Sequence, residues 1–246
     1  MQPRSWLTKS CSLAILLLGP IVCPSNAQVV FDHNATIAGR YESDVHIVDG
    51  ANPPTVVQIM EPAYFERSLL VEDSSIVHLL GGHVEEGLIA HDASIVDIRG
   101  GTIRNGVFAG DRAILQIAGG NFVDEDEFVT ADDFSVVNIH GGTLWALEAR
   151  GDAVAFLSGG TLQARLTAEE SGTIFIRGTG FNYPYGSIQD ASGTLTGFLD
   201  TGDAIMADFD INADGAIVLV PEPSGLILTL GAALAGAALL SRRERH

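Results

Sequence analysis

Cysteine is almost missing from this 246-residue chain: Cys11 and Cys23 are the only two, and both lie within the first 27 residues. No disulfide can form within the rest of the chain, so its stability must come from a packed core. Lysine is scarcer still, with Lys9 as the single example. Between Gln28 and Val220, eight arginines stand against 29 acidic residues, a formal charge of −21 with histidine neutral. Such a surface repels phosphate backbones, so we expect no nucleic acid partner.

Long uninterrupted apolar runs occur at the two ends of the chain, and the first predicts a secretory signal peptide over residues 1–27. A positively charged start precedes an apolar run at residues 12–22, and small residues then lead to a cleavage site between Ala27 and Gln28. The Sec export machinery reads segments of this kind, so it is an expected partner. A lipoprotein anchor on Cys23 is the alternative, which the bulky residue before that cysteine disfavours.

The C-terminal end combines a short motif, an apolar run and a basic tail. The motif is Val220-Pro221-Glu222-Pro223, the run covers residues 225–240 without a charge, and the tail contains Arg242, Arg243 and Arg245. A helix over the run would span roughly 24 Å against a hydrocarbon core of about 30 Å, and snorkelling arginines can make up the difference. We therefore predict a transmembrane helix at residues 225–240. A buried terminal helix of a soluble domain is the alternative.

Residues 220–246 resemble the PEP-CTERM sorting signal of Gram-negative bacteria in the proline–glutamate–proline motif, the apolar helix and the arginine-rich end. The resemblance implies recognition by an exosortase, a protease-like membrane enzyme, and removal or transfer of the tail near the motif. Family members tend to occur in species that make exopolysaccharide and biofilm. Because positive charge flanks both apolar ends, the residues between them should be translocated. The expected location is the cell envelope, the cell surface or the extracellular matrix.

The body between these ends contains a repeat that is marked by glycine. The first glycines of successive units are separated by 19, 19, 22, 18 and 19 residues. They are Gly81, Gly100, Gly119, Gly141, Gly159 and Gly178. Self-similarity at about 20 residues is typical of a solenoid.

Each unit also alternates with a period of two, which predicts a strand with one buried face. One set is apolar throughout and should point inward: Val77, Leu79, Val96, Ile98, Leu115, Ile117, Val137, Ile139, Ala155, Leu157, Ile174 and Ile176. The glycine pairs should turn the corners, where a side chain has no room. The pattern predicts an all-β, single-domain parallel β-helix with units of about 19 residues, and the crossover rule favours a right-handed coil.

The expected organisation assigns residues 28–70 to an N-terminal cap and the first coils, and residues 71–181 to the repeats. Residues 182–219 break the glycine period and should form a C-terminal β cap, with strands at 193–199 and 216–219. Caps of this kind protect the edge strands of a solenoid.

Phe156 and Phe175 form an outward aromatic pair on adjacent units, which predicts a surface that stacks on a sugar ring. Parallel β-helices also include carbohydrate-cleaving enzymes, so the outward polar residues His78, Asp97 and His140 are relevant. No second acid is obviously paired with Asp97, and glycoside hydrolysis needs two. We therefore expect no catalytic residues.

Asp208, Asp210, Asn212 and Asp214 match the start of a calcium-binding loop, and a glycine follows them. The match then fails, because the twelfth position is a proline rather than a glutamate and no helices flank the loop. A hairpin turn is the alternative to a calcium site. A cofactor is otherwise not expected.

Together these features predict an exported, non-enzymatic structural or adhesive protein of the surface or extracellular matrix. The alternative is a carbohydrate-binding or carbohydrate-cleaving β-helix that acts on exopolysaccharide. Aromatic or acidic side chains clustered in an outward groove would favour this alternative.

Overall fold

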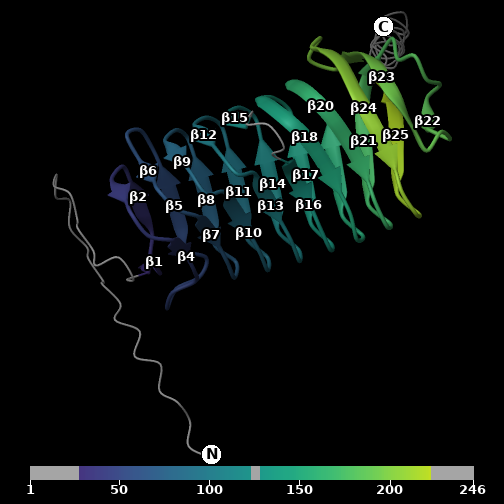
Figure 1. Ribbon diagram of the computed structural model, residues 1–246. Helices are drawn as coiled ribbons and strands as arrows, with labels where there is room; N and C mark the ends of the chain where they lie inside the picture. The colour runs from purple at the N-terminus through teal and green to yellow at the C-terminus, as the bar shows by residue number, and fades with distance from the viewer. Residues whose placement is uncertain (1–27, 123–127, 223–246) are drawn as a thin grey trace, which may run out of the picture.

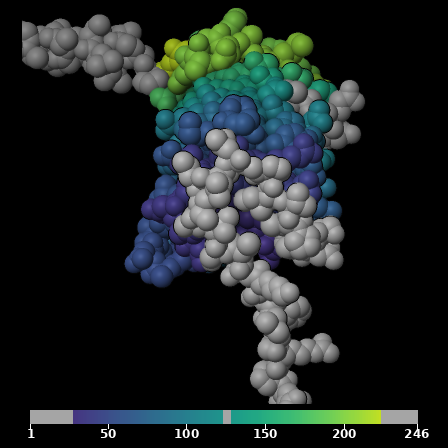
Figure 2. All heavy atoms as spheres, turned by 90° about the vertical axis from the view of Figure 1, so that its left-hand side faces the viewer, coloured from purple at the N-terminus to yellow at the C-terminus, as the bar shows by residue number. Residues whose placement is uncertain are grey.

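The computed structural model describes residues 28–122 and 128–222, which form 25 β-strands and no helix (Figure 1). The strands wind into a coil, and successive coils follow one another along a single axis (Figure 1). In Figure 2 the colours change in the same order, from purple through blue and teal to green. The fold is therefore a parallel β-solenoid, which confirms the predicted parallel β-helix.

Each coil contributes one strand to each of three faces. Face A contains β1 (Val29–Phe31), β4 (Val45–Ile47), β7 (Leu69–Val71), β10 (Leu88–Ala90), β13 (Val107–Ala109) and β16 (Phe128–Ala131). Face B contains β2 (Ala35–Ile37), β5 (Val56–Ile59), β8 (Ile76–Leu79), β11 (Ile95–Ile98), β14 (Ile114–Ile117), β17 (Val136–Ile139), β19 (Val154–Leu157), β21 (Thr173–Thr179) and β25 (Ala216–Pro221). Face C contains β3 (Arg40–Tyr41), β6 (Tyr64–Phe65), β9 (His83–Val84), β12 (Thr102–Ile103) and β15 (Asn121–Phe122).

Toward the C-terminal end the corner between faces C and A straightens. Strand β18 (Thr143–Ala149) pairs with β15 through its first residues and with β16 through its last, and β20 (Thr161–Ala168) continues this arrangement. All these pairings are parallel, and the β18–β20 register shifts once, between Leu144 and Ala146. Elsewhere equivalent positions lie opposite one another, as where Val96 lies between Val77 and Leu115.

The interior is a column of apolar side chains. All twelve residues predicted to point inward are buried, and Val96 and Leu115 are 0% exposed. One coil alone cannot bury these side chains, because each is covered by its equivalents in the coils before and after.

The corner between faces A and B carries an acidic residue in the left-handed backbone region, with φ of 61° at Asp73, 58° at Asp92 and 54° at Asp111. Aspartate tolerates this conformation better than most residues. The backbone N–H of each of these aspartates donates to the aspartate carboxylate of the next coil, over 3.1 Å from Asp73 to Asp92 and 3.2 Å from Asp92 to Asp111. These stacked acids, which extend from Asp49 to Asp133, are called the aspartate ladder below.

The glycine pairs form the corner between faces B and C, as predicted. A Cβ on Gly119 would lie 2.4 Å from the carbonyl oxygen of Arg99, so the first position of the pair has no room for a side chain. The second position, as at Gly101 with φ of 92°, needs a backbone conformation that favours glycine.

The C-terminal region differs from the prediction in one respect. Strand β23 (Ser192–Leu199) forms as expected, but the strand predicted at 216–219 belongs to the solenoid itself. Strands β24 (Ala204–Ile211) and β25 pair in parallel with β20 and β21, so a further coil follows the break in the glycine period. The cap consists of β22 (Gly186–Ser187) and β23, which run antiparallel to that last coil and cover its edges. The period breaks because the chain leaves the coil to build this cap before it returns.

Candidate binding groove on face B

The register of face B aligns two outward rows near the C-terminal end. The first row contains Asn138, Phe156 and Phe175, which lie opposite one another on β17, β19 and β21. The second row lies two residues further along each strand and contains His140, Ser158 and Arg177. In the last coil, strand β25 places shorter side chains at the end of both rows: Val218 lies opposite Phe175, and Val220 lies opposite Arg177.

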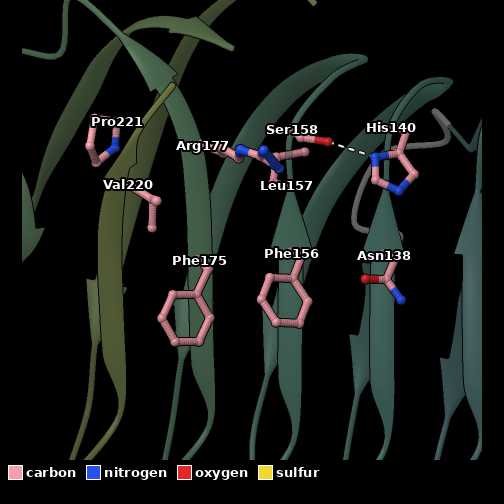
Figure 3. Close-up of a pocket in the computed structure, with 9 residues that line it drawn as sticks. All are labelled: Asn138, His140, Phe156, Leu157, Ser158, Phe175, Arg177, Val220 and Pro221. Atoms are coloured by element: carbon pink, nitrogen blue, oxygen red, sulfur yellow. Dashed lines mark hydrogen bonds between the residues drawn. The ribbon is translucent and has the colours of Figure 1, made fainter. Parts of the chain in front are cut away.

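These rows line a groove of about 490 Å³ (Figure 3). Its lining residues are Asn138, His140, Phe156, Leu157, Ser158, Phe175, Arg177, Val220 and Pro221. Figure 3 shows the two phenyl rings side by side on neighbouring strands, with the polar row beside them. The groove is therefore apolar along one side and hydrogen-bonding along the other.

The phenyl rings of Phe156 and Phe175 are nearly parallel, with 14° between their planes and 5.2 Å between their centroids. At that separation the rings are offset, which leaves part of each ring face uncovered. Phe156 is 40% exposed, so no loop buries the pair. The structure brings together the two residues that the sequence singled out for ligand stacking.

The polar row is held by hydrogen bonds. Nδ1 of His140 lies 2.7 Å from Oγ of Ser158, and the Ser158 hydroxyl lies 3.2 Å from the backbone carbonyl oxygen of Ile139. A hydroxyl has one hydrogen, so Ser158 donates either to Nδ1 or to the carbonyl oxygen, and the tautomer of His140 decides which. The pair supplies hydrogen-bonding groups on this side of the groove.

The cap fixes Arg177 at the end of the polar row. Nε of Arg177 lies 2.7 Å from the Asp200 carboxylate, and the Asp200 backbone N–H donates to the Arg177 carbonyl. The same loop continues to Asp203, whose carboxylate accepts the backbone N–H of Gly160 over 2.9 Å and the Thr201 hydroxyl over 2.7 Å. These contacts anchor the loop at residues 200–203 across the glycine corner beside the groove.

The groove wall includes part of the predicted sorting motif. Val220 and Pro221 are the last residues of β25 and pair with Arg177 and Gly178. Glu222 is exposed and follows directly. The fourth motif residue, Pro223, lies outside the described residues.

Several other predictions also fall outside residues 28–122 and 128–222. They are the signal peptide up to Ala27, the helix at residues 225–240 and the basic tail with Arg242, Arg243 and Arg245. Within the described residues, the structure has no helix of the length and apolarity needed to cross a membrane.

A second polar cluster on face B lies away from the groove. Asp97 is 7% exposed and its carboxylate lies 3.3 Å from Nδ1 of His78 and 2.9 Å from Nε of Arg99. His78 and Asp97 lie opposite one another on β8 and β11. Asp97 stands three coils before Phe156 on the same row, so the structure does not bring this carboxylate to the groove.

The candidate calcium residues are spread along β24 and the turn after it. Asp208 accepts a hydrogen bond from the Thr194 hydroxyl, and the Asn212 side chain donates to Glu169. Among the residues that the structure describes, no three histidine, aspartate or glutamate side chains are grouped to hold a metal ion. Asp208 and Asp210 thus lie on a paired strand and Asn212 and Asp214 in the turn after it, and calcium binding by these residues stays a prediction.

No protein-family model, curated protein or solved structure matches the chain.

Sequence reasoning found the phenyl pair but missed Asp200, Asp203 and the β25 wall. The phenyl pair follows from the repeat, because equivalent positions in adjacent units lie side by side. The loop at 200–203 and β25 reach the groove only after the chain has left the coil and returned, which no periodic signal records.

We predict that the loop at 200–203 loosens in acid. Hydrogen bonds from Thr201 and Gly160 hold the pKa of Asp203 below its ordinary value of 3.8, although desolvation acts in the opposite direction. Because the pKa is lower in the folded state, this contribution is present at neutral pH and is lost as the pH falls through the depressed value. Amide-exchange protection of Gly160 should therefore fall only below pH 3.8. An Asp203→Asn variant should lose this pH dependence, and equal acid sensitivity in both proteins would contradict the assignment.

Proposed function

We propose that the chain is an exported, non-enzymatic adhesive or structural protein of the cell envelope, cell surface or extracellular matrix. The observation that supports this most is the groove on face B, where a solvent-exposed phenyl pair and a hydrogen-bonded polar row are displayed on a continuous parallel sheet. A sheet face of this kind holds side chains at fixed spacing, which suits attachment to an extended partner.

The export part of the proposal rests on the two ends of the sequence. The signal peptide delivers the body through the Sec machinery, and the PEP-CTERM-like tail is handed to an exosortase. The membrane holds the protein through the helix at residues 225–240 at least until that step. The body without cysteine and with a charge of −21 suits an exported, soluble surface.

The position of the motif at the end of β25 predicts where processing occurs. A cut before Val220 would unpair β25 from Arg177 and Gly178 and remove one wall of the groove. We therefore expect the mature chain to start at Gln28 and to end at or after Pro221. Cell fractionation with mass spectrometry of the intact mature protein measures both ends.

A full-length mass in every fraction would contradict processing, and a C-terminus before Val220 would contradict the role given to β25. A variant in which Pro221, Glu222 and Pro223 are all replaced by alanine is the matched control. It should retain the tail and stay in the membrane fraction.

Carbohydrate binding is the second candidate function, and the amphipathic groove favours it. A pyranose ring has an apolar face and polar edges, which match the phenyl pair and the row of His140, Ser158 and Arg177. Asn138 adds an amide at the end of the phenyl row. The candidate ligand is an extracellular polysaccharide, because the body is translocated in this proposal.

Replacement of the exposed ring tests this second candidate. A Phe156→Ser variant should bind a retained polysaccharide roughly tenfold more weakly, which corresponds to about 1.4 kcal/mol. Retention on immobilised neutral β-glucan and alginate is the measurement. Phe134→Ser is the matched control, because Phe134 is 62% exposed and lies outside the groove. Equal retention of both variants would contradict a sugar site in the groove. New reducing or unsaturated ends on the polysaccharide would show cleavage and would contradict a non-enzymatic protein.

A further inference from the structure

The end of β25 is the point where the described chain leaves the solenoid, and it is surrounded by the cap. Pro221 pairs with Gly178 of β21, and Gly178 also pairs with Leu199 of β23. The end of β21 therefore lies between the point where the chain leaves and the hairpin of β23 and β24, and the two are about two strand spacings apart.

Three large apolar side chains of the cap and of the adjoining strand β24 are exposed to solvent. Tyr185 is 51% exposed, Phe198 is 52% exposed and Met206 is 72% exposed. They are called the cap patch below. The solenoid core does not use them, because the opposite side of the same hairpin supplies the buried residues Leu195 and Ile205.

Contacts in the cap place this patch around the point where the chain leaves. The Tyr185 hydroxyl lies 3.4 Å from the carbonyl oxygen of Gly178, which is the pairing partner of Pro221. Phe198 lies next to Leu199 and beside Gly180. Met206 is the diagonal neighbour of Phe198 across the hairpin, since Met206 pairs with Thr196.

The sequence after Pro221 limits the distance between the cap and a membrane. The apolar run begins at Gly225, and four extended residues reach about 14 Å at most. The headgroup layer on each side of a bilayer is about 5–8 Å thick. When the run at residues 225–240 is inserted, the end of β25 must therefore lie close to the lipid headgroups.

We propose that the cap patch rests in the headgroup layer of the bilayer while the tail is inserted. This inference depends on the membrane-inserted tail of the proposed function and adds a second contact to it. Tyrosine suits this layer because its ring is apolar and its hydroxyl is polar, and exposed phenylalanine and methionine gain from leaving water. The negative charge of the body opposes anionic lipid, so the contact is made with zwitterionic headgroups.

The patch orients the protein as well as holding it. A tail alone would leave the solenoid free to tilt on its short connection. With Tyr185 and Phe198 in the headgroup layer, the last coil faces the lipid and the first coil is directed away from it. The groove on face B, which ends at Pro221, then opens close to the membrane surface.

Tryptophan fluorescence of the full chain in phosphatidylcholine vesicles tests this placement. Trp6 and Trp145 are replaced by phenylalanine, and the single probe is then introduced as Phe198→Trp or, for the control, Phe134→Trp. Phe134 is also exposed to solvent, at 62% against 52% for Phe198. It lies on a turn between faces A and B that is three coils away from the last such turn. We expect the Phe198→Trp variant to emit at shorter wavelength than the control and to lose most of its emission when brominated lipid is included.

Flotation of the same vesicles separates the two proposals. If both variants float with the vesicles but neither probe is shifted or quenched, the tail is inserted and the cap patch does not touch lipid, which overturns the inference alone. If the chain does not float, the membrane-held tail of the proposed function fails. A blue shift at position 198 that depends on protein concentration and is not quenched would show a second copy over the patch, and it would also overturn the lipid contact.

Discussion

The stacking of each coil on the next is the constraint on which the rest of the structure depends. A single coil has too little apolar surface to fold alone, and its backbone groups find partners only in neighbouring coils. The inward residues, such as Val96 and Leu115, are buried because their equivalents lie directly before and after them. The same requirement explains the cap, since the last coil would otherwise present open edges, which β22 and β23 cover.

Stacking also places side chains of the same kind next to one another, which brings like charges together at the corner between faces A and B and aromatic rings together on face B. In the aspartate ladder, stacking brings carboxylates of the same charge near one another. A backbone N–H that donates to each carboxylate opposes this repulsion, because hydrogen bonds to charged acceptors are stronger than those to neutral ones. The contacts from Asp73 to Asp92 and from Asp92 to Asp111 are of this kind. On face B the same repetition creates the phenyl pair of Phe156 and Phe175.

The features that repeat were predictable from sequence, and the features that depend on a chain reversal were not. The inward rows, the glycine corners and the phenyl pair all follow from equivalent positions in a unit of about 19 residues. The return of β24 and β25 to the coil was missed because residues of the cap interrupt the period. Arg177 and Asp200 illustrate the limit, since their 2.7 Å contact joins a repeat position to a loop outside the repeat. The aspartate ladder does not continue into the next turn, because Gly151 rather than Asp152 occupies the left-handed position there, with φ of 61°.

Amide hydrogen exchange of the exported protein tests most directly the claim that coil-to-coil pairing holds the body together and fixes the groove. The turns between faces A and B lie on the surface, where amides ordinarily exchange fast. We predict slow exchange at Asp73, Asp92 and Asp111, comparable with strands β8 and β11, because each of these N–H groups is bonded to the next coil. Exchange at these turn amides as fast as in an unpaired loop would contradict the claim.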